Sequence, residues 1–138
     1  DADPNDRSIV DQMKPRGNLT PDVEGLALYQ GPYGTGYLIA SSQGSDTFLV
    51  YRRDGNNTFL GAFHIGEGPG IDAVTHTDGI DVTSADLGGE FEQGLFVAQD
   101  DDNPGSTQNF KIVPWESIAK AFNPPLEVPG GKNQSAAR

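Results

Sequence analysis

The sequence has no cysteine, little positive charge and no long apolar run. The lack of cysteine excludes disulfide bonds, thiolate metal sites and cysteine nucleophiles. Twenty acidic residues against nine basic ones give a net charge of −11 at pH 7, and the basic residues form no track for nucleic acid. This charge repels nucleic acid, anionic membranes and bare polyphosphates, so an anionic ligand would need an accompanying cation.

Glycine and proline are plentiful, with 18 Gly and 10 Pro among the 138 residues. Such a chain turns often, so long helices are not expected and an all-β fold is favoured. From residue 25 onward, short apolar runs alternate with turn residues that suit hairpins. The pattern predicts a four-stranded antiparallel meander at residues 26–29, 37–40, 48–51 and 59–65. It predicts three more strands at residues 79–82, 95–98 and 110–113, and one short helix at residues 116–122.

These elements divide the chain into four parts. Residues 1–20 form a polar lead segment with a weak strand near residues 8–10, and residues 21–66 form the first unit. Residues 67–122 form a second, incomplete unit, on which Trp115 and Phe122 are expected to pack the short helix. Residues 123–138 have too little apolar surface to order themselves and are expected to be a disordered tail.

The two units align with each other. Residues 24–28 match residues 78–82, and the offset grows from 54 to 62 residues through two further matched strands, 36–41 with 94–99 and 47–51 with 109–113. This spacing is near that of β-propeller blades. Two blades cannot close a ring, which needs about four to eight, so further blades must come from the parent chain or from self-association. Alone, two blades would expose strand edges and an apolar face.

Repeat-equivalent acids are the main candidates for chemistry. In a propeller the first strand of each blade lies innermost, so Glu24 and Asp78, which precede equivalent strands, should point into one mouth of the channel, with Asp22 and Asp72 nearby. Carboxylates held close together must take up protons or bind metal. Hard oxygen donors in flexible loops favour Ca²⁺. An arrangement in which these acids only cap turns or face solvent remains open.

Other candidate motifs are weaker. Residues 100–103 (DDDN) resemble the start of a calcium loop, but they do not form an EF-hand because Lys111 stands where a bidentate Glu is needed; a solvated acidic turn is equally consistent. Residues 41–44 lack the glycines of a nucleophile elbow. His64 and His76 have no ligand-like spacing and are interpreted as strand or loop residues.

Five longer motifs resemble the bacterial β-propeller (alkaline) phytases. They are 19–26 (LTPDVEGL), 36–44 (GYLIASSQG), 76–82 (HTDGIDV), 96–100 (FVAQD) and 108–115 (QNFKIVPW), and the resemblance covers residues 18–122. It implies two C-terminal blades of a six-bladed, calcium-dependent propeller that hydrolyses phytate as its calcium complex. It also implies a secreted protein with neither nucleic acid nor membrane as a partner.

The resemblance further implies roles for individual residues. Asp22 and Glu24 fall on an acidic pair that ligates the catalytic calcium cluster. Asp72 and Asp78 fall on further acids of that cluster, one of which would hold or activate the attacking water. Asp100, Asp102 and Asn103 would bind a structural calcium near the last blade. Asn109 would contact a phosphate group of the substrate.

Two other functions remain open. A propeller glycosidase would use paired carboxylates about 5 Å apart, and a calcium-stiffened β module for adhesion or assembly would use the acids only structurally. The lysines and arginine that hold substrate phosphates in the phytases belong to earlier blades. We therefore expect the isolated 138-residue chain to show little or no turnover.

Overall fold

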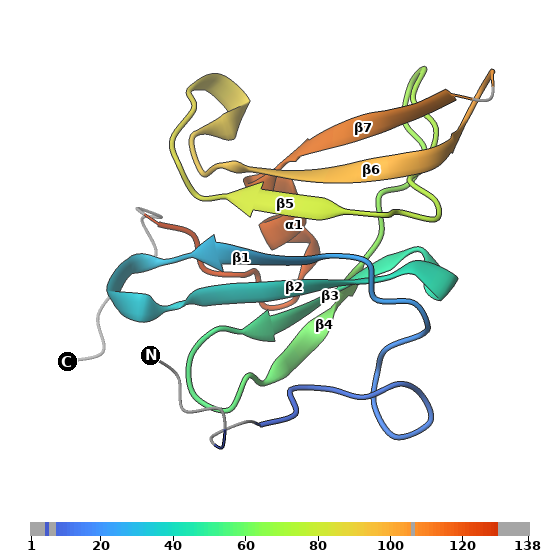
Figure 1. Ribbon diagram of the computed structural model, residues 1–138. Coiled ribbons are helices and arrows are strands. Elements are labelled where there is room, and N and C mark those ends of the chain that lie inside the picture. The colour runs from blue at the N-terminus through green and yellow to red at the C-terminus, as the bar shows by residue number, and fades with distance from the viewer. Residues whose placement is uncertain (1–4, 6–7, 106, 130–138) are drawn as a thin grey trace.

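Two antiparallel sheets and one α-helix make up the fold (Figure 1). The computed structural model describes residue 5, residues 8–105 and residues 107–129. The sheets have the strand orders β1-β2-β3-β4 and β5-β6-β7. The all-β class, with one four-stranded and one three-stranded meander typical of propeller blades, is confirmed. The elements are β1 (Leu26–Gln30), β2 (Gly36–Ser42), β3 (Thr47–Arg52), β4 (Phe59–Phe63), β5 (Ile80–Thr83), β6 (Leu95–Asn103), β7 (Thr107–Pro114) and α1 (Trp115–Ala121).

Strand alternation builds the core between the two sheets. In β1, Ala27 and Tyr29 are buried while the residues between them are exposed. The first sheet contributes Phe48, whose ring centroid lies 5.0 Å from that of Phe96 of the second sheet in an edge-on arrangement. Aromatic pairs of this geometry add stabilisation beyond the area they bury. The two sheets therefore form one core and hold their strands in a fixed relation.

The innermost strands β1 and β5 run side by side in the same direction (Figure 1). Gly25 permits this approach, because a Cβ at that position would lie 2.8 Å from Ile80 Cγ1 and 2.9 Å from its backbone nitrogen. At Gly79, a Cβ would meet nothing within 4 Å. The absence of a side chain at residue 25 therefore brings the starts of the two strands together.

The same backbone hydrogen bond recurs in both sheets and confirms the repeat. The Ser41 amide donates to the Gly25 carbonyl at 2.9 Å, and the Gln99 amide donates to the Gly79 carbonyl at 3.0 Å. Strands β6 and β7 are longer than predicted, because polar residues continue their pairing as far as Asn103 and Thr107. The first unit lacks this extension, because β2 ends at Ser42, the position equivalent to Asp100.

The short helix contacts β6 and β7 of the second unit, as expected, and it also reaches the first sheet (Figure 1). Trp115 is fully buried, and its ring stacks on Tyr29 of the first sheet with centroids 4.1 Å apart. Phe122 lies against Gly61 of β4, where a Cβ would come within 3.1 Å of its ring. The large aromatic rings fill space between the sheets and tie the second unit to the first.

The lead segment contains no strand at residues 8–10, contrary to expectation. It is instead anchored by side chains. Asp11 accepts a hydrogen bond from the Tyr51 hydroxyl at 2.6 Å and one from the Asn18 amide group at 3.0 Å. Leu19 packs on the cluster around Tyr51 on the outer face of the first sheet. The segment therefore covers part of a face that would otherwise be exposed.

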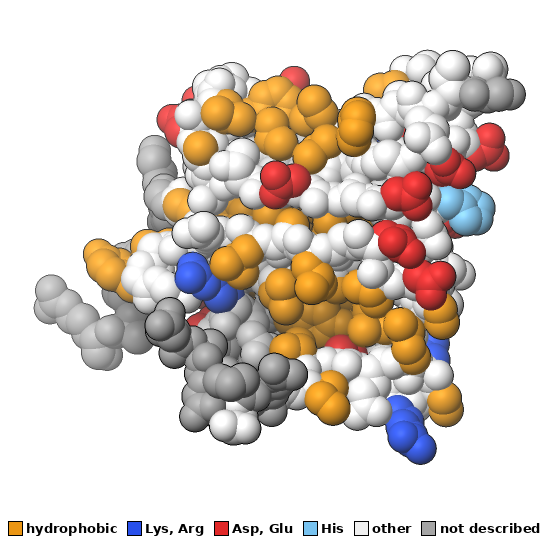
Figure 2. Space-filling view, in the orientation of Figure 1, with side chains coloured by type: hydrophobic (Ala, Val, Ile, Leu, Met, Phe, Trp, Pro, Cys, Tyr) orange, Lys and Arg blue, Asp and Glu red, His pale blue; other side chains and the backbone are white. Residues whose placement is uncertain are grey.

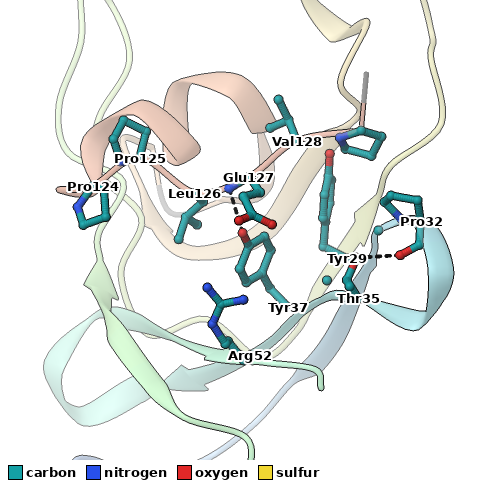
Figure 3. A pocket seen from close by; sticks show the side chains of 13 residues that line it. Tyr29, Pro32, Thr35, Tyr37, Arg52, Pro124, Pro125, Leu126, Glu127 and Val128 are labelled. Atoms are coloured by element: carbon teal, nitrogen blue, oxygen red, sulfur yellow. Dashed lines mark hydrogen bonds between the residues drawn. The ribbon is translucent and has the colours of Figure 1, made fainter. Parts of the chain in front are cut away.

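Residues 123–129 also differ from the expected disordered tail, whereas residues 130–138 lie outside the described residues. Leu126 and Val128 pack against the core, and the Glu127 amide donates to the Tyr37 hydroxyl at 2.7 Å. These two apolar side chains order the segment despite its prolines. Together with the turn after β1, it encloses a cavity of about 580 Å³ that also contains the Arg52 side chain (Figure 3).

Candidate functional site

The candidate acids gather at one edge of the sheets. Because β1 and β5 run in the same direction, Asp22 and Glu24 before β1 lie at the same edge as Asp78 before β5, and all three are exposed. Figure 2 shows Asp and Glu side chains along this edge, beside a histidine. The 580 Å³ cavity lies at the opposite ends of the strands, beyond the end of β1. The cavity is therefore separate from the acidic edge.

Two buried serines hold the segment that carries Asp22 and Glu24. The Ser41 hydroxyl accepts from the backbone amides of Glu24 at 2.9 Å and Gly25 at 2.8 Å. The Ser42 hydroxyl accepts from the Thr20 amide at 2.8 Å. Both serines are fully buried, so their hydroxyls support the backbone and are not exposed nucleophiles. This agrees with the missing nucleophile-elbow pattern.

The segment before β5 is held in the equivalent way, by longer side chains. Gln99 Oε1 accepts from the Asp78 amide at 2.7 Å, as Ser41 does from Glu24. Asp100 Oδ1 accepts from the Thr75 amide at 3.0 Å. A hollow of about 370 Å³ beside Asp78 is lined by Gln99 and by apolar residues that include Phe110. The second repeat thus fixes Asp78 by its backbone and leaves its carboxylate exposed.

The first unit also contacts the Asp78 segment. Gln43 Nε2 donates to Asp78 Oδ1 at 3.1 Å, and Asp46 Oδ1 accepts from the His76 amide at 2.8 Å. His76 itself is exposed and has a φ of 46°, so it is a turn residue, as the sequence indicated. These hydrogen bonds cross between the two sheets. They orient the Asp78 carboxylate relative to the first unit.

Lys111 brings together several of the residues expected to bind calcium or phosphate. Its Nζ donates to Asp72 Oδ1 at 2.6 Å, to Asp100 Oδ2 at 2.7 Å and to Asn109 Oδ1 at 3.1 Å. The side chains of Lys111 and Asp100 are 9% and 0% exposed, whereas that of Asp72 is 26% exposed. One ammonium group from the same chain is therefore shared by two carboxylates and offsets one of their two negative charges.

The electrostatics of this cluster favour its charged form. Burial alone raises the pKa of Asp100, but the hydrogen bonds from Lys111 and from the Thr75 amide outweigh burial and hold it below the ordinary value of 3.8. Burial lowers the pKa of Lys111, but its bonds to Asp100 and Asp72 raise it above the ordinary 10.5. Opposite charges at hydrogen-bond distance have this effect on both partners. The pair is therefore ionised at neutral pH.

Asn103 joins the same cluster, whereas Asp102 is exposed. With its amide assigned from its hydrogen-bond partners, Asn103 donates to Asp72 at 3.2 Å and lies against Asn109. The residues of the expected calcium loop therefore point to different places. Asp100 and Asn103 face Lys111 and Asp72, while Asp102 faces solvent.

The donor set suits a hard cation, but this chain does not close a site around one. In residues 8–105 and 107–129, no three or more His, Asp or Glu side chains are grouped so that they could hold a metal ion. No ion pair involves Asp22, Glu24 or Asp78 within the same described part. Carboxylate oxygens are the ligands that Ca²⁺ prefers. The acidic edge therefore offers exposed carboxylates of the type that binds calcium, without a closed set of ligands among the described residues.

Sequence reasoning did not identify the supporting role of Lys111. In β7, Lys111 is buried while its apolar neighbours Phe110 and Ile112 are 71% and 57% exposed, which is the reverse of what alternation of apolar and polar residues predicts. A buried lysine needs carboxylate partners, but the sequence pattern placed this lysine on the outside. Gln43 and Gln99 gave no signal either, because their partners are distant in sequence.

Comparisons with known proteins identify the family of the chain. The sequence model of the phytase family matches residues 1–134. The chain is similar to a 3-phytase of Bacillus subtilis (strain 168), with 48% identity over 107 residues that make up 75% of this chain and 28% of that relative. The chain thus spans little more than a quarter of the relative's length. In the part of the chain that the structure describes, no helix is long and apolar enough to cross a membrane. Since the family match covers almost the whole sequence, the chain belongs to the phytase family.

Proposed function

We propose that the complete protein hydrolyses phosphate esters of phytate in a calcium-dependent reaction, and that this chain supplies part of the calcium site at the edge where β1 and β5 begin. The observation that carries the proposal is that equivalent hydrogen bonds hold the backbone of Glu24 and of Asp78. Their backbone amides are bound by Ser41 and Gln99 at matching positions of the repeat, and both carboxylates remain exposed.

Asp22, Glu24 and Asp78 would hold the cation, with Asp72 contributing Oδ2, which Lys111 does not bind and which accepts a hydrogen bond from Asn103. When bound, calcium would offset the charge of the phosphate oxygens and lower the pKa of the attacking water. This requirement follows from charge, because a chain of net charge −11 otherwise repels a polyanionic substrate. Of the residues expected at a structural calcium, Asp102 is exposed and would be available to a second cation.

The side chains of this chain would orient and deprotonate the reactants. Either Asp72 or Asp78 would accept a proton from the attacking water, and Gln43 holds one oxygen of Asp78 in place at 3.1 Å. Asn109 accepts from Lys111 through Oδ1, and its amide nitrogen, which also donates to the Asn103 oxygen at 3.1 Å, would donate its second hydrogen to a substrate phosphate. The hydrolysis needs no covalent intermediate, since water attacks phosphorus in line.

The test is phosphate release from phytate by the complete protein during a calcium titration. E24Q and D78N should each lower calcium affinity by about 10-fold to 100-fold, because each removes one charged ligand. D54N is the matched control, since Asp54 is an exposed acid in the turn after β3 and should leave the titration unchanged. Activity that survives excess chelator would contradict the calcium dependence.

The alternatives give different results in the same assay. A glycosidase would hydrolyse glycosides without calcium, and a calcium-stiffened module would bind calcium without releasing phosphate. The isolated chain should release little phosphate, because it supplies only part of the site. Robust turnover by these 138 residues alone would contradict that division of the site.

A further inference from the structure

The connector, defined as residues 72–79, leads to β5 and carries Asp78. Polar groups from β6 and β7 hold it at several points along its length. Lys111 binds the Asp72 carboxylate, Asp100 accepts from the Thr75 amide, and Gln99 accepts from the Asp78 amide. The connector has no regular secondary structure, so its conformation depends on these contacts.

Lys111 is at the centre of this support. Its ammonium group is the hydrogen-bond donor that joins Asp72, at the beginning of the connector, to Asp100, which binds the connector's middle. Asp100 is fully buried, so its carboxylate depends on this partner for charge balance. Without Lys111, Asp72 and Asp100 would lose the hydrogen-bond donor that they share.

The first unit shows that this lysine is not required by sheet packing. Leu49 occupies the repeat position equivalent to Lys111 and is buried in an apolar cluster. Ser42 occupies the position equivalent to Asp100 and supports its segment with a neutral hydroxyl. One repeat therefore holds its acidic segment without charge, while the other uses a buried lysine and carboxylate. This difference indicates a specific role for Lys111.

We propose that Lys111 is a positioning residue that, through Asp72 and Asp100, fixes the connector and thereby the placement of Asp72 and Asp78 toward a cation at the acidic edge. The claim that Asp72 and Asp78 face a cation rests on the proposed function. The claim that Lys111 fixes the conformation of the connector is independent of it. Lys111 does not touch the cation or substrate in this role. Its ammonium binds Oδ1 of Asp72, and Oδ2, which accepts a hydrogen bond from the Asn103 amide at 3.2 Å, is the oxygen that would bind the cation.

The test compares K111M with K120M in the complete protein. Methionine keeps the length of the side chain and removes the charge. Lys120 is an exposed lysine paired with Glu116 at 2.9 Å, so K120M removes the same charge from the surface. In K111M, amide hydrogen exchange in a peptide spanning residues 72–79 should be about tenfold faster, while peptides from β2 and β3 and all peptides of K120M should exchange as in the unmodified protein.

Calcium binding gives a second measurement, by calorimetry and by the calcium concentration at half-maximal phosphate release. Both should shift by about tenfold in K111M and stay constant in K120M. Loss of folded protein would lower only the maximal rate and the binding stoichiometry, without moving the midpoint. A shifted midpoint therefore supports positioning, whereas an unchanged midpoint overturns it.

If K111M fails to fold, D100N/K111M removes both buried charges and serves as the second variant. It should show the same faster exchange in residues 72–79, because Asp72 still lacks its anchor. A folded double variant with unmodified exchange in this peptide would overturn the proposal. If the unmodified protein binds no calcium, the proposed function fails, and the exchange result still decides whether Lys111 fixes the connector.

Discussion

The two units support their candidate acids with the same hydrogen bonds but with different chemistry. In the first unit, the hydroxyls of Ser41 and Ser42 accept from the backbone that carries Glu24. In the second, Gln99 and Asp100 accept from the backbone that carries Asp78. The first unit leaves its acids without an internal cation, whereas the second includes the buried Lys111. A repeat can thus keep its backbone geometry while only one copy acquires a charged support.

The largest difference between the units should appear in stability. D100A removes the carboxylate that balances the Lys111 charge, and breaking such a buried pair costs about 3–5 kcal/mol. S42A at the equivalent position removes only neutral hydrogen bonds, which contribute about 1–2 kcal/mol. Urea unfolding in calcium-free buffer measures both values. Equal losses in the two variants would show that the second unit does not depend on its charged pair.

The junction of the units should give the next largest effect. G25A places a Cβ 2.8 Å from Ile80 Cγ1, and such overpacking costs about 1–3 kcal/mol. G79A is the control, because a Cβ there meets nothing within 4 Å and should cost less than about 0.5 kcal/mol. If calcium is shared between Glu24 and Asp78, calorimetry should show weaker binding in G25A only. Unchanged unfolding of G25A would indicate that β1 and β5 do not approach as closely as described.

The strands and the repeat could be predicted from sequence because alternation and turn residues act locally. Residues 24–28 and 78–82 could be aligned by their residue pattern alone. The hydrogen bonds that Ser41 and Gln99 accept from the Glu24 and Asp78 amides confirm this alignment. The support by Lys111 could not be predicted in the same way, because its partners Asp72 and Asp100 meet it only after the connector folds onto β6 and β7. The additional contact of the helix with the first sheet was not foreseen for a similar reason, since Trp115 stacks on Tyr29, a residue far away in the chain.

The stability contributions of Asp11 and Asp100 should both change with pH. The difference between these two residues should be smaller than the differences between the substitutions above. Burial raises the pKa of Asp11, but hydrogen bonds led by that from Tyr51 lower it below 3.8 overall, and the pKa of Asp100 is lowered in the same sense. A carboxyl with a depressed pKa stabilises the fold above its unfolded pKa and loses that contribution as pH falls through its folded pKa. The stability differences between the unmodified protein and D11N or D100N should therefore be constant near neutral pH and shrink below about pH 4.

At alkaline pH, the contribution of the Asp100–Lys111 pair to stability depends on the charge of Lys111. The pKa of Lys111 is raised, so its contribution is complete below 10.5 and is lost only as pH rises through its folded pKa. Unfolding of D100N and the unmodified protein, followed from pH 4 to pH 10, should give parallel curves. A difference that changes steeply across this range would contradict ionisation of the pair throughout it.

The smallest expected effect concerns the hydrogen bond that joins the units directly. Gln43 donates to the exposed carboxylate of Asp78 at 3.1 Å, so it should contribute only about 0.5–1 kcal/mol. A double-mutant cycle with Q43A and D78A isolates this coupling, and Q30A, at an exposed position at the far end of β1, should show none with D78A. Coupling in the first cycle alone means that the first unit orients the acid of the second. No coupling between Q43A and D78A would mean that Asp78 is held by its own unit only, so that the two repeats would meet at the acidic edge without cooperating there.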